Sequence, residues 1–309
     1  MADKYTAPPR WTEAELEAAR QHATADFVKE RLGEGAARYQ PVLAQCVYAV
    51  RDLFRATSNL RDLHSGSAFA VSPSLMTPAR YLGGPPVSED DLNVLAGSSV
   101  AKRKRLDSRL AELAASVIEE ALDRDRVPWL FAEPSREPSE AELEVAIRWT
   151  AGLWAAQAVQ TQRRGESAQR QEMAVARVLD EVGFQRVQVN EIDFTARNMA
   201  PGQYCRETKV LGAKCDIPVM LHDGRLLLIE CKVSNSSLNS IKRLIRETGG
   251  KAIGWRNGFG NRAITGAVLS GVFKLVHLQQ AQDEYNVAIF WERDMAPLAS
   301  FLKAVKDRP

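Results

Sequence analysis

The stretch that decides the fold runs Lys214-Cys-Asp-Ile-Pro-Val-Met-Leu-His-Asp-Gly-Arg-Leu-Leu-Leu-Ile-Glu-Cys-Lys-Val233. Its Asp223-Gly224 pair is a strong turn signal between two apolar runs and predicts a β-hairpin. With the turn centred there, Asp216 lies opposite Glu230 or Cys231. Directly opposed side chains of an antiparallel pair have Cβ atoms about 5 Å apart. The hairpin is therefore expected to bring Asp216 close to the end of the second strand.

Charged residues follow the apolar part of that second strand. Leu226 to Ile229 is a continuous apolar run, typical of a buried strand, and Glu230 and Lys232 come directly after it. They share one face of the strand, while Cys231 points the other way. Alternating charges commonly decorate a solvated strand face, and that remains the ordinary alternative. Charges at the end of a buried strand, however, need a compensating partner.

A divalent cation would supply that compensation. Two carboxylates this close are unfavourable unless a cation or a raised pKa relieves them, and hard oxygen ligands suit Mg²⁺. A bound ion would lower the pKa of an attacking water and neutralise charge on a phosphorane-like transition state. Lys232 would stabilise that charge or position the nucleophile. The pattern thus predicts an Mg²⁺ site for phosphodiester hydrolysis.

Upstream of the hairpin, the sequence is expected to be mostly helical as far as residue 138. Thr12-Glu-Ala-Glu15 is a capping box, and Ser88-Glu-Asp-Asp91 caps another helical region. Between them, the Ser, Pro and Gly residues of 65–86 predict an ordered loop with a short strand. The expected helices span 13–31, 35–56 and 101–123.

From residue 139 onward the pattern becomes α/β. Ser139-Glu-Ala-Glu142 opens a helix to Arg163, Gly165 is expected to break it, and a second helix runs over 166–182. Apolar strands and helices then alternate. We expect strands at 187–189, 217–221, 225–233, 267–273 and 287–291, and helices at 238–248, 275–284 and 296–306. The predicted organisation is a helical region, 1–138, for DNA binding or dimerisation, followed by a nuclease domain, 139–309.

Composition identifies an ordinary globular protein with an uneven charge distribution. The 309 residues are 45% hydrophobic and 26% charged, which excludes a disordered or collagen-like chain. The net charge of +2 divides into about −4 up to residue 160 and about +6 beyond it. Between Lys232 and Lys274 alone, eight basic residues face one acidic residue. This distribution favours a nucleic-acid partner next to the hairpin.

The cysteines and the N-terminus indicate a cytoplasmic protein. The cysteines form no C-x-x-C pair and have no His partner at zinc spacing, so reduced thiols are expected at Cys46, Cys205, Cys215 and Cys231. The first residues lack a signal-peptide pattern, and the apolar stretch 149–159 is too short to span a bilayer.

The hairpin motif resembles the PD-(D/E)XK nuclease superfamily. Asp216 is followed by thirteen residues and then by Glu230-Cys231-Lys232, a motif of about 17 residues. The resemblance implies a central mixed sheet flanked by helices. It also implies that Asp216, Glu230 and the backbone carbonyl of Cys231 hold Mg²⁺, and that Lys232 assists the nucleophile. Cys215 stands where the family has a proline, which is often replaced.

A further feature of that superfamily is an acidic residue on the helix before the hairpin. On the helix 166–182, Glu172 falls within the apolar stripe formed by Ala168, Val175, Ala176, Leu179 and Val182. Glu172 is therefore the expected fourth catalytic residue. Alternatively, its carboxylate reaches solvent at the edge of the stripe. Glu166 is a rival, although at the helix start it is more simply explained by the helix dipole.

Over most of its length the chain is also similar to the XamI group of restriction endonucleases. The segments that carry this similarity are 79–92, Arg163-Arg-Gly-Glu-Ser-Ala-Gln-Arg-Gln-Glu172 and Ala288-Ile-Phe-Trp-Glu-Arg-Asp294. The resemblance implies a homodimer in a bacterial or archaeal cell that cuts both strands of a short palindrome and leaves 5′-phosphate ends. It also implies a DNA methyltransferase as genetic partner.

The expected DNA contacts follow the hairpin. Lys242, Arg243 and Arg246 lie on adjacent turns of one helix, a layout for phosphate contacts, although a solvated helix face is the alternative. The glycine-rich stretch 249–271 is expected to be a loop that enters a DNA groove, or else a mobile surface loop. Its candidate base-reading residues are Arg256, Asn257, Asn261 and Arg262, and Arg163 and Arg164 are further candidates. A second basic cluster comprises residues 102–105 and Arg109.

These features together predict a type II restriction endonuclease. A repair or modification-dependent nuclease of the same superfamily is the nearest alternative. The other alternative is an inactive DNA-binding module with the nuclease fold. Retention of Asp216, Glu230 and Lys232 together argues against the inactive module, because loss of one of them would be its signature.

Overall fold

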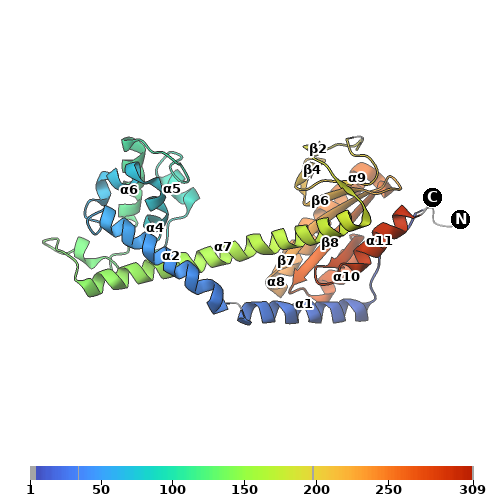
Figure 1. Ribbon diagram of the computed structural model, residues 1–309, viewed down its shortest axis with the longest axis horizontal. Coiled ribbons are helices and arrows are strands. Elements are labelled where there is room, and N and C mark those ends of the chain that lie inside the picture. The colour runs from blue at the N-terminus through green and yellow to red at the C-terminus, as the bar shows by residue number, and fades with distance from the viewer. Residues whose placement is uncertain (1–4, 34, 197, 308–309) are drawn as a thin grey trace. The chain divides into compact units, whose positions relative to one another are not determined.

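The computed structural model describes residues 5–33, 35–196 and 198–307, which pack as two units (Figure 1). Unit 1 comprises Met1–Gly33 and Arg164–Pro309, and unit 2 comprises Glu34–Arg163. Helix α7 (Glu140–Val182) contributes its first part to unit 2 and its second part to unit 1. The division expected from the sequence, at residue 138, coincides with neither boundary of these units.

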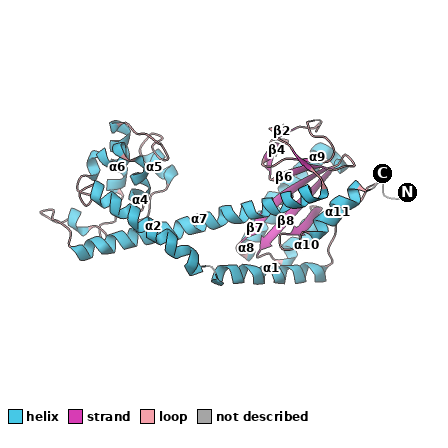
Figure 2. Ribbon diagram, in the orientation of Figure 1, coloured by secondary structure: helices cyan, strands magenta, loops and turns pink. Residues whose placement is uncertain are grey.

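Among the described residues of unit 1, six strands form a mixed sheet (Figure 2). Their order is β1-β3-β6-β7-β8-β9, with antiparallel pairing of β3, β6 and β7 and parallel pairing of β7, β8 and β9. Strands β7 and β8 therefore lie in the interior of the sheet. The mixed α/β class predicted from the sequence is confirmed. The strands are β1 (Gln185–Arg186), β3 (Gln203–Tyr204), β6 (Ile217–Met220), β7 (Leu226–Ser234), β8 (Ala263–Gly271) and β9 (Val287–Trp291).

Helices cover both faces of this sheet. On one face, α7 and α11 (Ala296–Lys306) pack through residues such as Leu179 and Leu302. On the other, α1 (Glu13–Gly33) and α10 (Leu275–Asp283) pack through Leu16 and Leu278. Burial of these apolar stripes against the sheet stabilises the layered arrangement. Because α1 belongs to this core, the first helix of the chain is part of unit 1 and not of the helical unit.

The predicted hairpin of β6 and β7 is confirmed. Ile217 pairs with Ile229, and this register places Asp216 opposite Glu230 instead of Cys231. The amide of Leu221 donates to the carbonyl of Arg225 at 2.8 Å and closes the turn. Gly224 adopts φ +80°, the left-handed conformation that the turn requires and that glycine accepts without strain.

The segment after β7 is helical over 238–248 as predicted, but it differs from the prediction beyond residue 249. It forms a short helix α8 (Ser237–Ser240), a π-helix η4 (Ile241–Gly249), a helix α9 (Gly250–Phe259) and a turn η5 (Gly260–Arg262) before β8 begins. The predicted glycine-rich loop over 249–271 is therefore wrong. Glycine in a helix costs about 1 kcal/mol relative to alanine, but Ala252, Trp255 and Phe259 recur at helical spacing and are buried.

The apolar face of α9 packs in the same cluster as a small sheet that the sequence did not predict. Its strands are β2 (Glu191–Ile192), β4 (Thr208–Val210) and β5 (Ala213–Cys215), in the order β2-β4-β5. Trp255 and Phe259 share a core with Ile192 and Val210, and the indole Nε1 of Trp255 donates to the carbonyl of Val210 at 3.2 Å. This contact fixes α9 beside the strands that lead into the hairpin.

Unit 2 is a helical bundle with its own core. That core includes Leu53, Phe69, Ile118 and Trp129, all buried. Ser88 caps α5 as predicted, since its hydroxyl accepts from the amide of Asp91. Besides the first part of α7, the helices described in this unit are α2 (Gly35–Ala56), η1 (Leu63–Ser65), α3 (Ser67–Val71), η2 (Pro73–Leu75), α4 (Met76–Arg80), α5 (Glu89–Leu95), α6 (Ser108–Glu120) and η3 (Pro128–Leu130).

Two predictions for helices are corrected by this structure. Most of the expected loop 65–86 is instead the short helices α3, η2 and α4, because Phe69, Met76 and Ala79 are drawn into the core. The expected break at Gly165 does not occur, and α7 is continuous from Glu140 to Val182. Gly165 is exposed with open space around it, so only its own propensity cost opposes the helix.

Within the residues that the structure places, no helix is long and apolar enough to cross a membrane. The thiols of Cys46, Cys205, Cys215 and Cys231 are all free, as the absence of a paired cysteine pattern predicts.

Candidate active site

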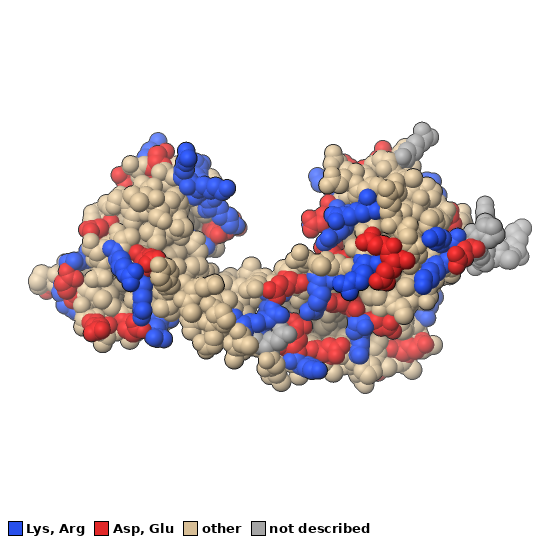
Figure 3. Space-filling view, viewed as in Figure 1, with Lys and Arg blue, Asp and Glu red and all other residues tan. Residues whose placement is uncertain are grey.

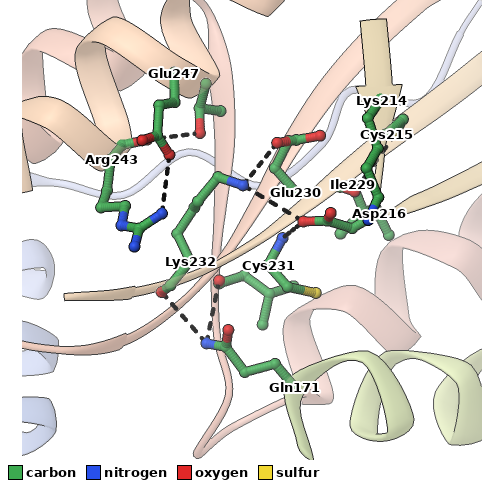
Figure 4. Close-up of polar contacts among 12 residues, drawn as sticks. Gln171, Lys214, Cys215, Asp216, Ile229, Glu230, Cys231, Lys232, Arg243 and Glu247 are labelled. Atoms are coloured by element: carbon green, nitrogen blue, oxygen red, sulfur yellow. Dashed lines mark hydrogen bonds and ion pairs between the residues drawn. The ribbon is translucent and has the colours of Figure 1, made fainter. Parts of the chain in front are cut away.

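Asp216, Glu230 and Lys232 converge at the hairpin (Figure 4). The ammonium of Lys232 lies 2.7 Å from Oε2 of Glu230 and 3.4 Å from Oδ2 of Asp216. The same Asp216 oxygen accepts a hydrogen bond from the backbone amide of Cys231 at 2.8 Å. The Asp216 and Lys232 side chains are 17% and 10% exposed, and that of Glu230 is fully buried. The predicted grouping of two carboxylates and one ammonium is thus present.

A second ammonium completes this cluster. Lys251, in the first turn of α9, lies 2.7 Å from the same Oε2 of Glu230. It also donates a hydrogen bond to the backbone carbonyl of Lys214, two residues before Asp216, at 2.5 Å. Glu230 therefore shares one oxygen between two lysines, and the cluster balances two carboxylates with two ammonium groups.

The charges around Lys232 stabilise its protonated form. Burial disfavours the ammonium, but the carboxylates of Glu230 and Asp216 outweigh that cost and raise the pKa of Lys232 above its ordinary value. The carboxylate of Glu247, on η4, acts in the same direction. Lys232 is therefore a cation at neutral pH and can donate hydrogen bonds, while it cannot accept a proton.

The donor set fits a hard divalent cation. Oε1 of Glu230 is buried and accepts no hydrogen bond from any residue that the structure describes. Such an orphaned carboxylate oxygen needs a cation or a water. The described residues contain no group of three or more His, Cys, Asp and Glu side chains arranged to hold one metal ion. Two carboxylates nevertheless suffice for Mg²⁺, which usually keeps several waters and binds through one or two carboxylates.

The two thiols in and beside the motif are expected to be unreactive. Burial, reinforced by the carboxylates of Asp216 and Glu172, raises the pKa of Cys231 well above its ordinary value. Burial likewise raises the pKa of Cys215, helped by Glu230 and Asp216. A thiolate is required for nucleophilic attack, so neither cysteine is suited to that role.

Glu172 is buried on α7, where the helical stripe placed it, although Ala168 of that stripe is exposed. Its Oε2 accepts an ion-paired hydrogen bond from Arg206 at 2.6 Å. Its charge, like that of Asp216, reaches the thiol of Cys231. The neighbouring Gln171 donates through its amide nitrogen to the carbonyls of Lys232 and Val268, both at 3.4 Å. These two hydrogen bonds connect the second part of α7 to β7 and β8 beside the motif.

The predicted DNA-contacting residues lie mostly on the surface of unit 1. Lys242, Arg243 and Arg246 are exposed on η4, and Arg243 pairs with Glu247 at 3.2 Å. The remaining candidates are spread over three elements. Arg256 and Asn257 are exposed on α9, Asn261 and Arg262 are exposed on η5, Arg164 is exposed on α7, and Arg163 is half-buried on the same helix.

Sequence reasoning missed Lys251, Arg206 and Gln171 as parts of the site. Lys251 lies in the stretch for which the sequence predicts a loop, and only the helix α9 brings it to Glu230. Arg206 lies between β3 and β4, in a stretch without recognisable periodicity. Gln171 directly precedes Glu172, and an uncharged residue in an amphipathic helix gives no signal of its own.

Comparison with known proteins identifies the family of the chain. The model of the XamI restriction endonuclease family matches residues 58–291, a range that includes Glu172, Asp216, Glu230 and Lys232. The chain is 35% identical over 267 residues to the type II restriction enzyme XamI of Xanthomonas campestris pv. amaranthicola. The aligned region covers 84% of this chain and 95% of that enzyme. No solved structure matches the chain. The chain therefore belongs to the XamI restriction endonuclease family.

Proposed function

We propose that this protein is an Mg²⁺-dependent type II restriction endonuclease that hydrolyses phosphodiester bonds of double-stranded DNA at the β6–β7 hairpin. The observation that carries the proposal is the position of Lys232, whose ammonium lies within ion-pairing distance of both Asp216 and Glu230. A restriction endonuclease family implies a divalent metal requirement in general. The oxygen-only donor set and the orphaned Oε1 of Glu230 favour a hard divalent ion, the class to which Mg²⁺ belongs.

Asp216, Glu230 and the backbone carbonyl of Cys231 would hold the ion. When bound, the ion would lower the pKa of an attacking water and neutralise the charge that develops on the phosphate. Asp216 is held for this role by the amide of Cys231 and by Lys232. Glu230 is held by the ammonium groups of Lys232 and Lys251.

Lys232 contributes a fixed positive charge. Because its pKa is raised, it stays protonated and donates to the reacting phosphate or to the attacking water. Glu172 is the fourth catalytic candidate, and Arg206 holds its carboxylate in place. We assign Arg206 a positioning role, since it acts through Glu172.

DNA is proposed to contact the basic surface after the hairpin. Lys242, Arg243 and Arg246 would meet phosphates, which fix the register of a protein on DNA without reading its sequence. The exposed side chains of α9 and η5 supply Arg and Asn groups for base edges, and Arg163 and Arg164 are further contacts. In unit 2, residues 102–104 line a cavity of about 360 Å³ with Arg80 and Glu89. Glu89 pairs with Arg80 and Lys102, so Arg103 and Lys104 are the basic groups there that we propose for contact with flanking phosphates.

Further properties are proposed from family membership. The protein would act in the cytoplasm as a homodimer on a short palindrome and leave 5′-phosphate ends. A DNA methyltransferase encoded nearby would protect the host genome at the same sequence. Finding such a gene beside this one would support restriction over repair.

The test is incubation of supercoiled plasmid with the purified protein, in Mg²⁺ or in EDTA. Discrete fragments that require Mg²⁺ support restriction, whereas a smear indicates an unspecific nuclease and retarded, uncut DNA indicates a binding module. The variants Asp216→Ala and Lys232→Ala should lose at least about a hundredfold in cleavage rate. Lys303→Ala, exposed on α11, is the matched control. If the site variants cut as fast as the parent, the site assignment fails.

A further inference from the structure

Glu230 is unusual for a carboxylate of a proposed metal site, because it already has two cationic partners. Two ammonium groups, those of Lys232 and Lys251, each lie 2.7 Å from its Oε2. Lys232 belongs to the sequence motif, but Lys251 comes from a separate helix, α9. The site therefore contains one more cation than the motif supplies.

Lys251 is held at this place by three contacts. Besides Glu230, its ammonium donates to the carbonyl of Lys214. It also lies 5.9 Å from the ring centroid of Trp255, one turn further along α9. Trp255 is itself buried in the small sheet's core. The position of the ammonium is thus built into the fold and is not a chance surface pairing.

In the ion pair of Lys251 with Glu230, only the lysine side chain is partly exposed and can move away. Its side chain is 25% exposed, whereas that of Glu230 is fully buried. A buried carboxylate needs a counter-charge whenever no other cation is present. The orphaned Oε1 belongs to the same carboxylate, so a divalent ion bound there would lie close to the Lys251 ammonium on Oε2 and would be repelled by it.

We propose that Lys251 is a built-in counter-ion of Glu230: it neutralises the carboxylate in the metal-free enzyme and must withdraw when the divalent ion binds. This inference rests on the proposed metal site at Asp216 and Glu230. In the absence of DNA, the apparent metal affinity is then the intrinsic affinity multiplied by the fraction of molecules in which Lys251 has left Glu230. Lys251 thereby makes metal loading conditional, since anything that attracts the lysine away from Glu230 favours the ion.

The experiment is titration of the full-length protein with Mn²⁺ alone, without DNA, with free Mn²⁺ followed by electron paramagnetic resonance. Lys251→Met removes the charge and keeps most of the side-chain volume. Lys251→Gln also removes the charge but keeps a donor for the carbonyl of Lys214. Lys251→Arg keeps the charge, and Lys303→Met makes the same chemical change on an exposed part of α11. Far-ultraviolet circular dichroism checks that each variant is folded.

Both neutral variants should bind Mn²⁺ about tenfold more tightly than the parent if the lysine occupies Glu230 about 90% of the time. The Arg variant and the Lys303 control should bind as the parent does. The melting temperature of the neutral variants should also rise more with added Mn²⁺.

Two results would overturn the inference in distinguishable ways. If the neutral variants bind Mn²⁺ no more tightly than the parent, while Glu230→Gln abolishes binding, the metal site stands and Lys251 is not its competitor. If Mn²⁺ binding is absent throughout, or persists unchanged in Asp216→Ala and Glu230→Gln, the metal site itself is wrong and the counter-ion role falls with it.

Discussion

The backbone and the side chain of Cys231 have separate environments. Its amide donates to Asp216, whereas its thiol lies on the opposite face of β7, against the core that α7 and α11 cover. Replacement by alanine keeps the backbone and removes only the sulfur. Cys231→Ala should therefore retain cleavage within about threefold of the parent and lose about 1 kcal/mol of stability from lost packing. Plasmid cleavage and urea unfolding measure the two effects, and a large loss of cleavage would contradict a purely backbone role.

Glu172 and Arg206 form a largely buried ion pair whose two halves should respond differently to mutation. The side chains are 11% and 22% exposed. Arg206→Ala leaves a buried carboxylate without its partner and should lower the free energy of unfolding by about 3 kcal/mol. Glu172→Gln keeps a hydrogen-bonding side chain, so the protein should stay folded while cleavage falls at least about tenfold if the carboxylate is catalytic. Unchanged cleavage by a folded Glu172→Gln would restrict the pair to a structural role.

Between elements, the hydrogen bond from Tyr204 to Asp180 joins β3 to α7 at 2.8 Å. Burial, with the neighbouring Asp180 carboxylate, raises the pKa of Tyr204 to about 12, compared with about 10 in an unfolded chain. The group therefore contributes stability that is fully present below about pH 10 and is lost as the pH rises towards 12.

Tyr204→Phe should cost about 1 kcal/mol at pH 8, where the hydrogen bond is intact. The difference in unfolding free energy between parent and variant should then shrink between pH 10 and pH 12. Urea denaturation at several pH values measures it. A difference that stays constant across this range would exclude Tyr204 as the titrating group.

The elements also show what the sequence can predict. The hairpin, its register to within one residue, and the ends of β9 follow from local signals, namely a two-residue turn and uninterrupted apolar runs. The burial of Glu172 follows from helical periodicity. The sequence predicts a loop where α9 forms, because the glycines are a stronger local signal than Ala252, Trp255 and Phe259. The burial of these three residues depends on a small sheet distant in the sequence. Likewise, Lys251 reaches Glu230 only through that tertiary contact, which no local pattern encodes.

At the scale of the whole molecule, the two units have separate hydrophobic cores. The core around Phe69 and Trp129 lies entirely within unit 2, and the cores around the sheet lie within unit 1. In the view of Figure 3, Asp and Glu side chains lie among Lys and Arg side chains on both units. The proposed DNA binding would therefore depend on local groups of basic residues.

The basic face of η4 offers a quantitative test of this view. Each phosphate contact that is lost should reduce the slope of log affinity against log salt by about 0.9. Lys242→Gln and Arg246→Gln should each show nearly that change, and Arg243→Gln a smaller one, because Arg243 already pairs with Glu247. The measurement is fluorescence anisotropy of a labelled duplex in EDTA, where the DNA is not cut, over a range of salt concentrations. Lys303→Gln is the matched control on α11. An unchanged slope in the triple variant of η4 would mean that its lysine and arginines form a solvated helix face, and the phosphate contacts would then have to lie elsewhere on the chain.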